Sequence, residues 1–133
     1  MKLIYPAIFY PFDEGEGYTV EIPDLPGCVS EGDTLADAIL MGTDAASGWI
    51  LDELEDGNSI PIASAASDLN PEEGGIVNLL VLDMDTYAEK YGNKAVRKNI
   101  TIPAYMDTYA EAHGLSLSKV MQEAISEYMA KKS

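Results

Sequence analysis

Residues 96–102, Val-Arg-Lys-Asn-Ile-Thr-Ile, limit the possible folds of the chain more than any other segment. Side-chain character alternates along it, which is typical of a β-strand because successive side chains on a strand point to opposite faces. Pro103 follows at once, and proline ends a strand and suits the first turn of a helix. The pattern therefore predicts a short strand whose core-facing side chains are Ile100 and Ile102. The opposite, polar face carries Arg97, Asn99 and Thr101.

Two short helices are predicted after this strand. The first covers 104–112 and ends near Gly114, and the second begins after Ser116 as its N-cap. A strand and two helices of about 37 residues have too little core for independent stability, and the strand has no partner within the segment. Pairing with the same strand of a second copy solves both problems and predicts a two-fold symmetric dimer. The predicted dimer core contains Ile100, Ile102, Val120, Met121 and Ile125.

Acidic and basic residues are divided unevenly along the chain. Residues 1–89 hold one base and nineteen acids, a net charge of −18, whereas residues 90–133 hold seven bases and four acids, a net charge of +3. This asymmetry predicts two modules with different partners, residues 1–91 and residues 92–133, joined at Gly92 and Asn93. The simpler interpretation, that the acids only confer solubility, stays open.

The patterns in the first module predict an α+β order of three strands, a long helix and one more strand. Strands are expected over 2–12 and 18–23, with a short third strand near Cys28 and Val29. Asp33 or Thr34 is expected to cap a helix that ends at Gly57. Trp49 is expected in the core-facing side of this helix, and the alternative is an exposed ring edge that serves an interface. The apolar run 76–85 predicts a strand buried on both faces, and 86–92 a short helix.

Little in the sequence favours catalysis, a metal ion or a cofactor. The chain has one cysteine, Cys28, which excludes an intrachain disulfide and fits a reducing cytoplasm. The one histidine, His113, lies in the second module, far from Cys28 in the sequence. It is expected at the end of a helix, where its side chain interacts favourably with the helix dipole. No apolar run approaches the roughly 20 residues needed to cross a bilayer. A metal-dependent nuclease would need convergent carboxylates, and no spacing singles out the acids near strands, Asp13, Glu21, Asp24 and Asp83.

The sequences RKNITIP (97–103) and HGLSLSKVMQEAI (113–125) resemble the ribbon-helix-helix family of DNA-binding proteins. In that family a two-stranded ribbon from two chains lies in the major groove of DNA. The resemblance implies base contacts by Arg97, Asn99 and Thr101. It also implies phosphate contacts at the start of the second helix, by Ser116, Leu117, Ser118 and Lys119. A plain dimerisation ribbon with a polar outer face remains the alternative.

The sequences YTVEIPDLPGCVSEGDTLADAI (18–39) and GNSIPIAS (57–64) resemble the HicB antitoxin family. Nearly the whole chain is covered. The resemblance implies a partial ribonuclease-H-like β-β-β-α-β domain without catalysis at 1–91, and a ribbon-helix-helix module at 92–133. It implies a cytoplasmic homodimer or higher homo-oligomer that inhibits a small basic mRNA-cleaving toxin of HicA type and represses its own operon by binding operator DNA. An acidic module would attract such a basic toxin.

Two other functions remain open at this point. One is a solitary ribbon-helix-helix transcription regulator without a toxin. The other is a metal-dependent ribonuclease-H-like nuclease. The operator sequence, the identity of the toxin and the choice between a dimer and a tetramer are not determined by the sequence.

Overall fold

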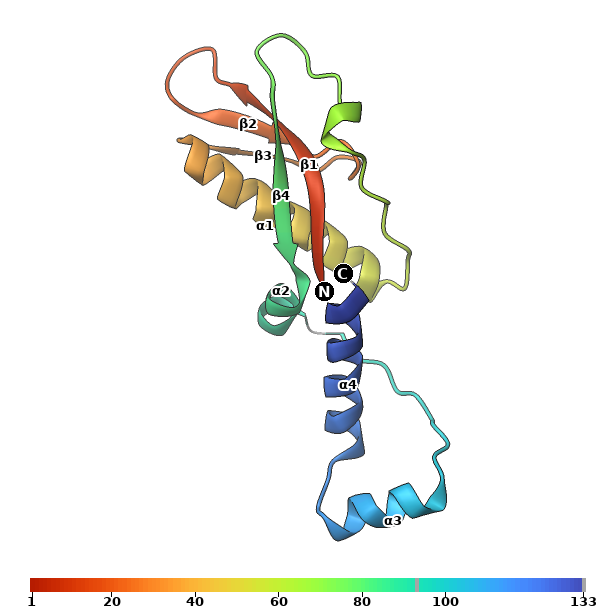
Figure 1. Cartoon of the computed structure of the whole chain (residues 1–133). Helices are drawn as coiled ribbons and strands as arrows, with labels where there is room; N and C mark the ends of the chain where they lie inside the picture. The colour runs from red at the N-terminus through yellow and green to blue at the C-terminus, as the bar shows by residue number, and fades with distance from the viewer. Residues whose placement is uncertain (93, 133) are drawn as a thin grey trace. The chain divides into compact units, whose positions relative to one another are not determined.

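The computed structural model of the chain describes residues 1–92 and 94–132, so the predicted linker residue Asn93 lies outside the described residues. By its internal contacts the chain divides into two compact units, Lys2–Gly92 and Asn93–Ser133. Figure 1 shows a sheet with helices in the first unit and helices in the second. Each unit is described by itself below.

A four-stranded antiparallel sheet organises the first unit, in the order β3-β2-β1-β4. Its strands are β1 (Lys2–Pro11), β2 (Tyr18–Glu21), β3 (Val29–Gly32) and β4 (Ile76–Asp83). The central strand β1 pairs with β4 from Lys2↔Asp83 to Phe9↔Ile76. The predicted order of three strands, a helix and a fourth strand is confirmed, as is the mixed α+β class.

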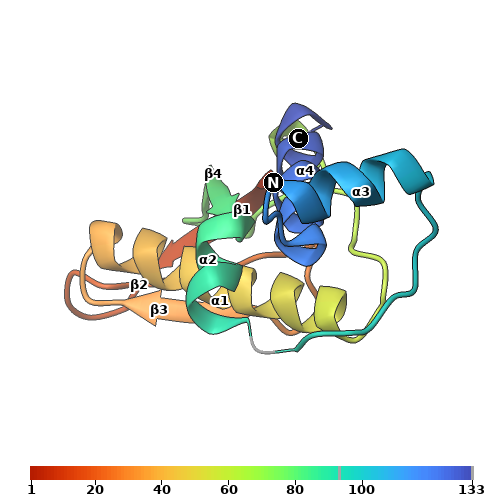
Figure 2. The same ribbon diagram turned by 90° about the horizontal axis from the view of Figure 1, so that it is seen from below.

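The long helix α1 (Leu35–Glu55) covers one face of this sheet, as Figure 2 shows. Thr34 caps its first turn, because the threonine hydroxyl accepts a hydrogen bond from the Asp37 amide at 3.1 Å. The buried side of α1 is rich in small residues, which lets the helix approach the strands closely. At Gly42 an added Cβ would lie only 3.1 Å from both methyl groups of Val20. The helix is followed by Gly57 in the left-handed conformation, with a φ of 79°.

Two short helical segments complete the first unit. The turn η1 (Ala66–Asp68) interrupts the loop between α1 and β4, and α2 (Met84–Tyr91) follows β4 directly. Asp83 caps α2 by accepting a hydrogen bond from the Thr86 amide at 3.3 Å. The predicted short helix therefore exists and begins two residues earlier than expected.

Two expectations about burial in this unit are wrong. Leu80 and Leu82 are fully buried, but Leu79 and Val81 on the opposite face are half-exposed. The reason is that β4 lies at the edge of the sheet and the long helix covers only one face. Trp49 is not in the core but half-buried at the surface, where its indole N–H donates to the Pro26 carbonyl at 3.1 Å.

The second unit contains the two predicted helices, α3 (Ala104–Ala112) and α4 (Leu117–Lys132). Gly114 adopts a φ of 64° between them, and the Ser116 hydroxyl accepts a hydrogen bond from the Lys119 amide at 3.3 Å. The strand predicted at 96–102 is not formed within the single chain, where the described residues 94–103 belong to no strand or helix. A strand needs a hydrogen-bonded neighbour, and this unit holds no second strand in its described part.

Candidate nucleic-acid and protein interfaces

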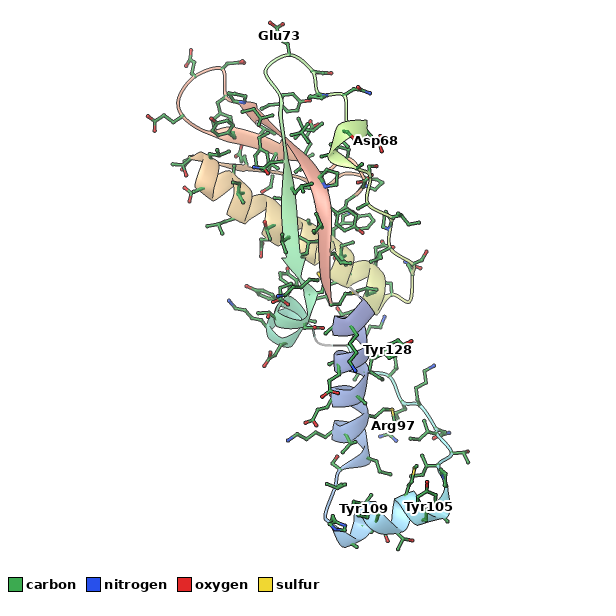
Figure 3. All side chains as sticks on the ribbon, in the orientation of Figure 1. Asp68, Glu73, Arg97, Tyr105, Tyr109 and Tyr128 are labelled. Carbon is green, nitrogen blue, oxygen red and sulfur yellow. The ribbon has the colours of Figure 1, made fainter. Side chains whose placement is uncertain are left out.

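An apolar cavity of about 470 Å³ lies between the segment before α3, the helix α3 and the helix α4. Nearly all of its wall is hydrocarbon or aromatic ring, and Figure 3 shows Tyr105 and Tyr109 on α3. The lining residues are Ile100, Ile102, Tyr105, Met106, Tyr109, Ala110, Leu115, Leu117, Val120, Met121 and Ala124.

The cavity shows that the second unit has almost no core of its own. Among its described residues only Ala110 is buried, while Tyr105 is 71% and Tyr109 60% exposed. Burying a large apolar side chain contributes about 1.5 to 3 kcal/mol relative to leaving it in water. A unit with this many half-exposed apolar side chains forgoes most of that free energy as a single chain. Covering this face would recover that free energy.

The residues predicted for a dimer core are mostly brought together by the structure. Ile100, Ile102, Val120 and Met121 all line the cavity. The fifth, Ile125, does not line it and is 53% exposed on α4. The four cavity residues therefore form one apolar surface, and Ile125 lies further along α4 than Val120 and Met121.

The residues predicted to contact DNA bases are exposed. Arg97, Asn99 and Thr101 all lie in the extended segment, whereas the neighbouring Ile102 is half-buried (Arg97 is labelled in Figure 3). Ile100 is 51% exposed and lines the apolar cavity together with Ile102. Lys98, between Arg97 and Asn99, is exposed as well.

The residues predicted to contact phosphate form the start of α4. Ser116 uses its hydroxyl to cap the Lys119 amide, and Leu117 and Ser118 lie in the first turn. That turn carries no acidic residue, and the first amides of a helix have no carbonyl partner within it. An anion is therefore favoured there by both the amides and the helix dipole. Leu117 has a second role, since its side chain lines the apolar cavity.

His113 is found at the C-terminal end of α3, as expected. Its ring stacks on Tyr109 with a centroid distance of 3.9 Å, and its Nδ1 lies 2.8 Å from the Tyr109 carbonyl oxygen. These contacts account for the histidine as a helix-end residue.

Two acids that a nuclease would need have structural roles in the first unit. Asp24 accepts hydrogen bonds from the Ser64 amide at 2.9 Å and from its hydroxyl at 2.6 Å, which holds the α1–β4 loop. Asp83 caps α2, and hydrogen bonds from the Thr86 amide and hydroxyl lower the pKa of this carboxyl. Among residues 1–92 and 94–132 no three histidine, cysteine or acidic residues are grouped so as to hold a metal ion. The geometry gives the nuclease alternative no support.

A second cavity, of about 380 Å³, opens on the surface between α1, the turn before β3 and α2. Its wall is half polar and includes the carboxylates of Asp44 and Asp52 and the rings of Trp49 and Tyr87. Burial, Asp44, Tyr91 and Asp52 raise the pKa of the Tyr87 phenol. We refer to this cavity as the acidic aromatic pocket.

The sequence held a partial signal for this pocket. Asp44, Gly48 and Asp52 recur every four residues, which places them on one face of a helix. Nothing in the order of residues shows that Tyr87, from a different helix, closes the pocket above Gly48. The sequence therefore indicated an acidic helix face but not a cavity.

Comparison with known proteins gives a consistent picture. A family model described as HicB_like antitoxin of bacterial toxin-antitoxin system matches residues 5–130. An uncharacterised 14.9 kDa protein in the rep-hol intergenic region of Haemophilus phage HP1 (strain HP1c1) is 34% identical over 105 residues, covering 78% of this chain and 76% of that protein. Antitoxin HicB 1 of Photorhabdus laumondii subsp. laumondii is 38% identical over 58 residues, covering 44% of this chain and 37% of that protein. The chain thus spans little more than a third of the length of this second relative.

The fold is also found among solved structures. A chain of a toxin-antitoxin complex from Streptococcus pneumoniae superposes with a TM-score of 0.63 at 22% identity, covering 96% of this chain and 99% of that chain. In the described part of the chain no helix combines the length and the apolar character that crossing a membrane requires.

Proposed function

Because the chain belongs to the HicB-like antitoxin family of bacterial toxin-antitoxin systems, we propose that it inhibits a small basic mRNA-cleaving toxin of HicA type and represses its own operon. The first module, 1–91, binds the toxin, and the second, 92–133, binds operator DNA as a dimer. Both activities belong in the cytoplasm. The family is one of antitoxins rather than enzymes, and no residue is assigned a catalytic role.

Charge supports the assignment of toxin binding to the first module. Residues 1–89 carry a net charge of −18, which accelerates the approach of a basic protein and disfavours nucleic acid as a ligand. A basic ribonuclease must present cations to RNA, so an acidic module competes for the same surface. The four-stranded sheet with α1 on one face is the partial ribonuclease-H-like domain of this proposal.

The observation that supports DNA binding is the apolar cavity beside an exposed basic segment. Two copies that pair residues 96–102 as antiparallel strands cover Ile100 and Ile102 and complete the core that each copy lacks. The same pairing leaves Arg97, Asn99 and Thr101 on the outer face of the ribbon. A two-stranded ribbon fits the major groove of B-DNA, where arginine pairs with guanine and asparagine with adenine.

The start of α4 supplies the second kind of DNA contact. In this proposal Ser116, Leu117, Ser118 and Lys119 hold a backbone phosphate, while the ribbon contacts the bases. Phosphate contacts position the protein and base contacts give it sequence preference.

One experiment separates the two activities. The full chain is titrated against the DNA upstream of its own gene and, in parallel, added to an RNA-cleavage assay with the basic toxin encoded beside it. We expect a specific DNA complex and stoichiometric loss of cleavage. Loss of cleavage without a DNA complex would refute autorepression, and a DNA complex without inhibition would leave a solitary regulator. RNA cleavage by the chain itself would refute the whole assignment.

A further inference from the structure

We propose that the acidic aromatic pocket receives an arginine side chain of the toxin. This inference rests on the proposed function, since it names one way in which the acidic module holds its basic partner. The pocket lies within the first unit, where α2 contacts α1, and Figure 2 shows these two helices.

The pocket stays open because position 48 is a glycine, which has no side chain to fill it. Asp44, Gly48 and Asp52 follow one another at intervals of four along α1, so both carboxylates flank the glycine on one helix face. An added Cβ at Gly48 would lie 3.0 Å from the Tyr87 hydroxyl. The missing side chain therefore keeps open the space between the two carboxylates.

Two aromatic rings make the pocket suited to a flat cation. The hydrogen bond from the indole N–H to the Pro26 carbonyl, at 3.1 Å, fixes Trp49, and Tyr87 lines the side formed by α2. A guanidinium group stacks on aromatic rings and forms paired hydrogen bonds with a carboxylate, which a single ammonium cannot do. The combination of two rings with Asp44 and Asp52 matches both properties of arginine.

A neighbouring hollow also combines carboxylates with aromatic rings, and there a lysine of this chain supplies the cation. It shares Asp44 and Tyr87 with the pocket and also contains Asp83, Tyr91 and Lys90. There the Lys90 ammonium lies over the Tyr91 ring, 5.3 Å from its centroid. No lysine or arginine of the described residues lines the acidic aromatic pocket itself. Its carboxylates and rings are therefore available to a cation from another molecule.

The first test uses the one tryptophan of the chain as a reporter. The full chain, labelled with ¹⁵N, is titrated with N-acetylarginine amide and separately with the neutral analogue N-acetylcitrulline amide. We expect the Trp49 indole N–H resonance to shift saturably with the arginine compound only, and the shift to vanish in the Asp44→Asn/Asp52→Asn double variant. Equal shifts with both compounds, or none with either, would overturn the proposal.

The second test measures toxin binding by the full chain. We expect Asp44→Asn/Asp52→Asn to weaken binding about tenfold or more, since a charge pair shielded from water is lost. A matched control, Asp13→Asn/Glu14→Gln, removes the same charge from the β1–β2 loop and is expected to weaken binding far less. Gly48→Ala fills the pocket without changing charge and is expected to weaken binding while the melting temperature shows an intact fold.

The outcomes separate the pocket from the proposed function. If the wild-type chain does not bind the toxin, the proposed function fails, and the proposal that the pocket receives a toxin arginine fails with it. If the wild-type chain binds and both double variants weaken binding equally, only diffuse charge matters and the pocket proposal is overturned. Unchanged binding in Asp44→Asn/Asp52→Asn overturns it as well, and leaves the antitoxin assignment intact.

Discussion

Truncation of Ile100 to alanine is expected to weaken dimerisation of the chain. The side chain lines the apolar cavity and is 51% exposed in the single chain, so strand pairing can remove about half of its surface from water. Full burial of an isoleucine contributes about 1.5 to 3 kcal/mol, so covering the exposed half contributes about 0.8 to 1.5 kcal/mol per copy. A symmetric dimer counts this contribution twice.

The expected effect is therefore a loss of about 1.5 to 3 kcal/mol of association free energy, or a rise in the dimer Kd of roughly 10- to 140-fold. Sedimentation equilibrium of the full chain over a range of concentrations measures this constant directly. Circular dichroism of the same samples checks that α1 and the sheet are unchanged.

Ile62→Ala is the matched control, because Ile62 is also an isoleucine but is 94% exposed in the loop after α1. Its truncation is expected to leave the dimer Kd unchanged. Equal dimer constants for wild type and Ile100→Ala would refute pairing through this face. Equal weakening by the two variants would show that the effect is not specific to the cavity.

Four further substitutions test other parts of the molecule. Arg97→Ala and Asn99→Ala should each cost about 1 to 3 kcal/mol of preference for operator over random DNA in a competition titration, and an unchanged preference excludes the segment as the base-contacting element. Asp24→Ala removes two hydrogen bonds that the carboxylate receives from the α1–β4 loop and should lower the free energy of urea unfolding by about 2 kcal/mol. The ionised carboxylate of Asp83 stabilises the capped helix at pH values above 3.8, the ordinary pKa of this group, because its pKa is lowered in the folded chain. This contribution disappears as the pH falls through the lowered pKa. Thr86→Val should raise that pKa in a ¹³C NMR titration by removing the hydroxyl donor, and an unchanged value would assign the whole effect to the backbone amide.

Toxin binding and DNA binding are expected to reinforce each other. The acidic modules repel DNA, and a bound basic toxin cancels part of their charge. Operator affinity should therefore rise when toxin is added at low to moderate ratios, most clearly at low salt. Weaker operator binding at every ratio of toxin would contradict this charge cancellation.

Local chemistry explains what was predictable from the sequence. The cap at Thr34, the turn at Gly114 and the cap at Ser116 each depend on residues within four positions of one another. Helix ends are set by such short-range bonds and by backbone conformations that glycine adopts freely. The sequence alone therefore determined the order of the elements in the first unit, the start of α1 and α4, and the family.

Only the tertiary structure decided which apolar residues are covered. The run 76–83 is apolar on both faces, but its place at the edge of a sheet with one long helix leaves Leu79 and Val81 half-exposed. Likewise Trp49 lies at the surface because its indole bonds to a carbonyl 23 residues away. Periodicity shows which residues share a face, but not whether another element lies against that face.

Each of the two proposed interfaces also depends partly on the sequence and partly on contacts between distant residues. Alternation along 96–102 showed a polar and an apolar face, yet the strand itself needs a second chain to supply its hydrogen bonds. The acidic aromatic pocket needs Tyr87 from α2 placed over Gly48 of α1, 39 positions earlier in the sequence. Contacts between residues so far apart arise from packing, so the sequence determined the uneven distribution of charge along the chain, and the tertiary structure determined the cavities.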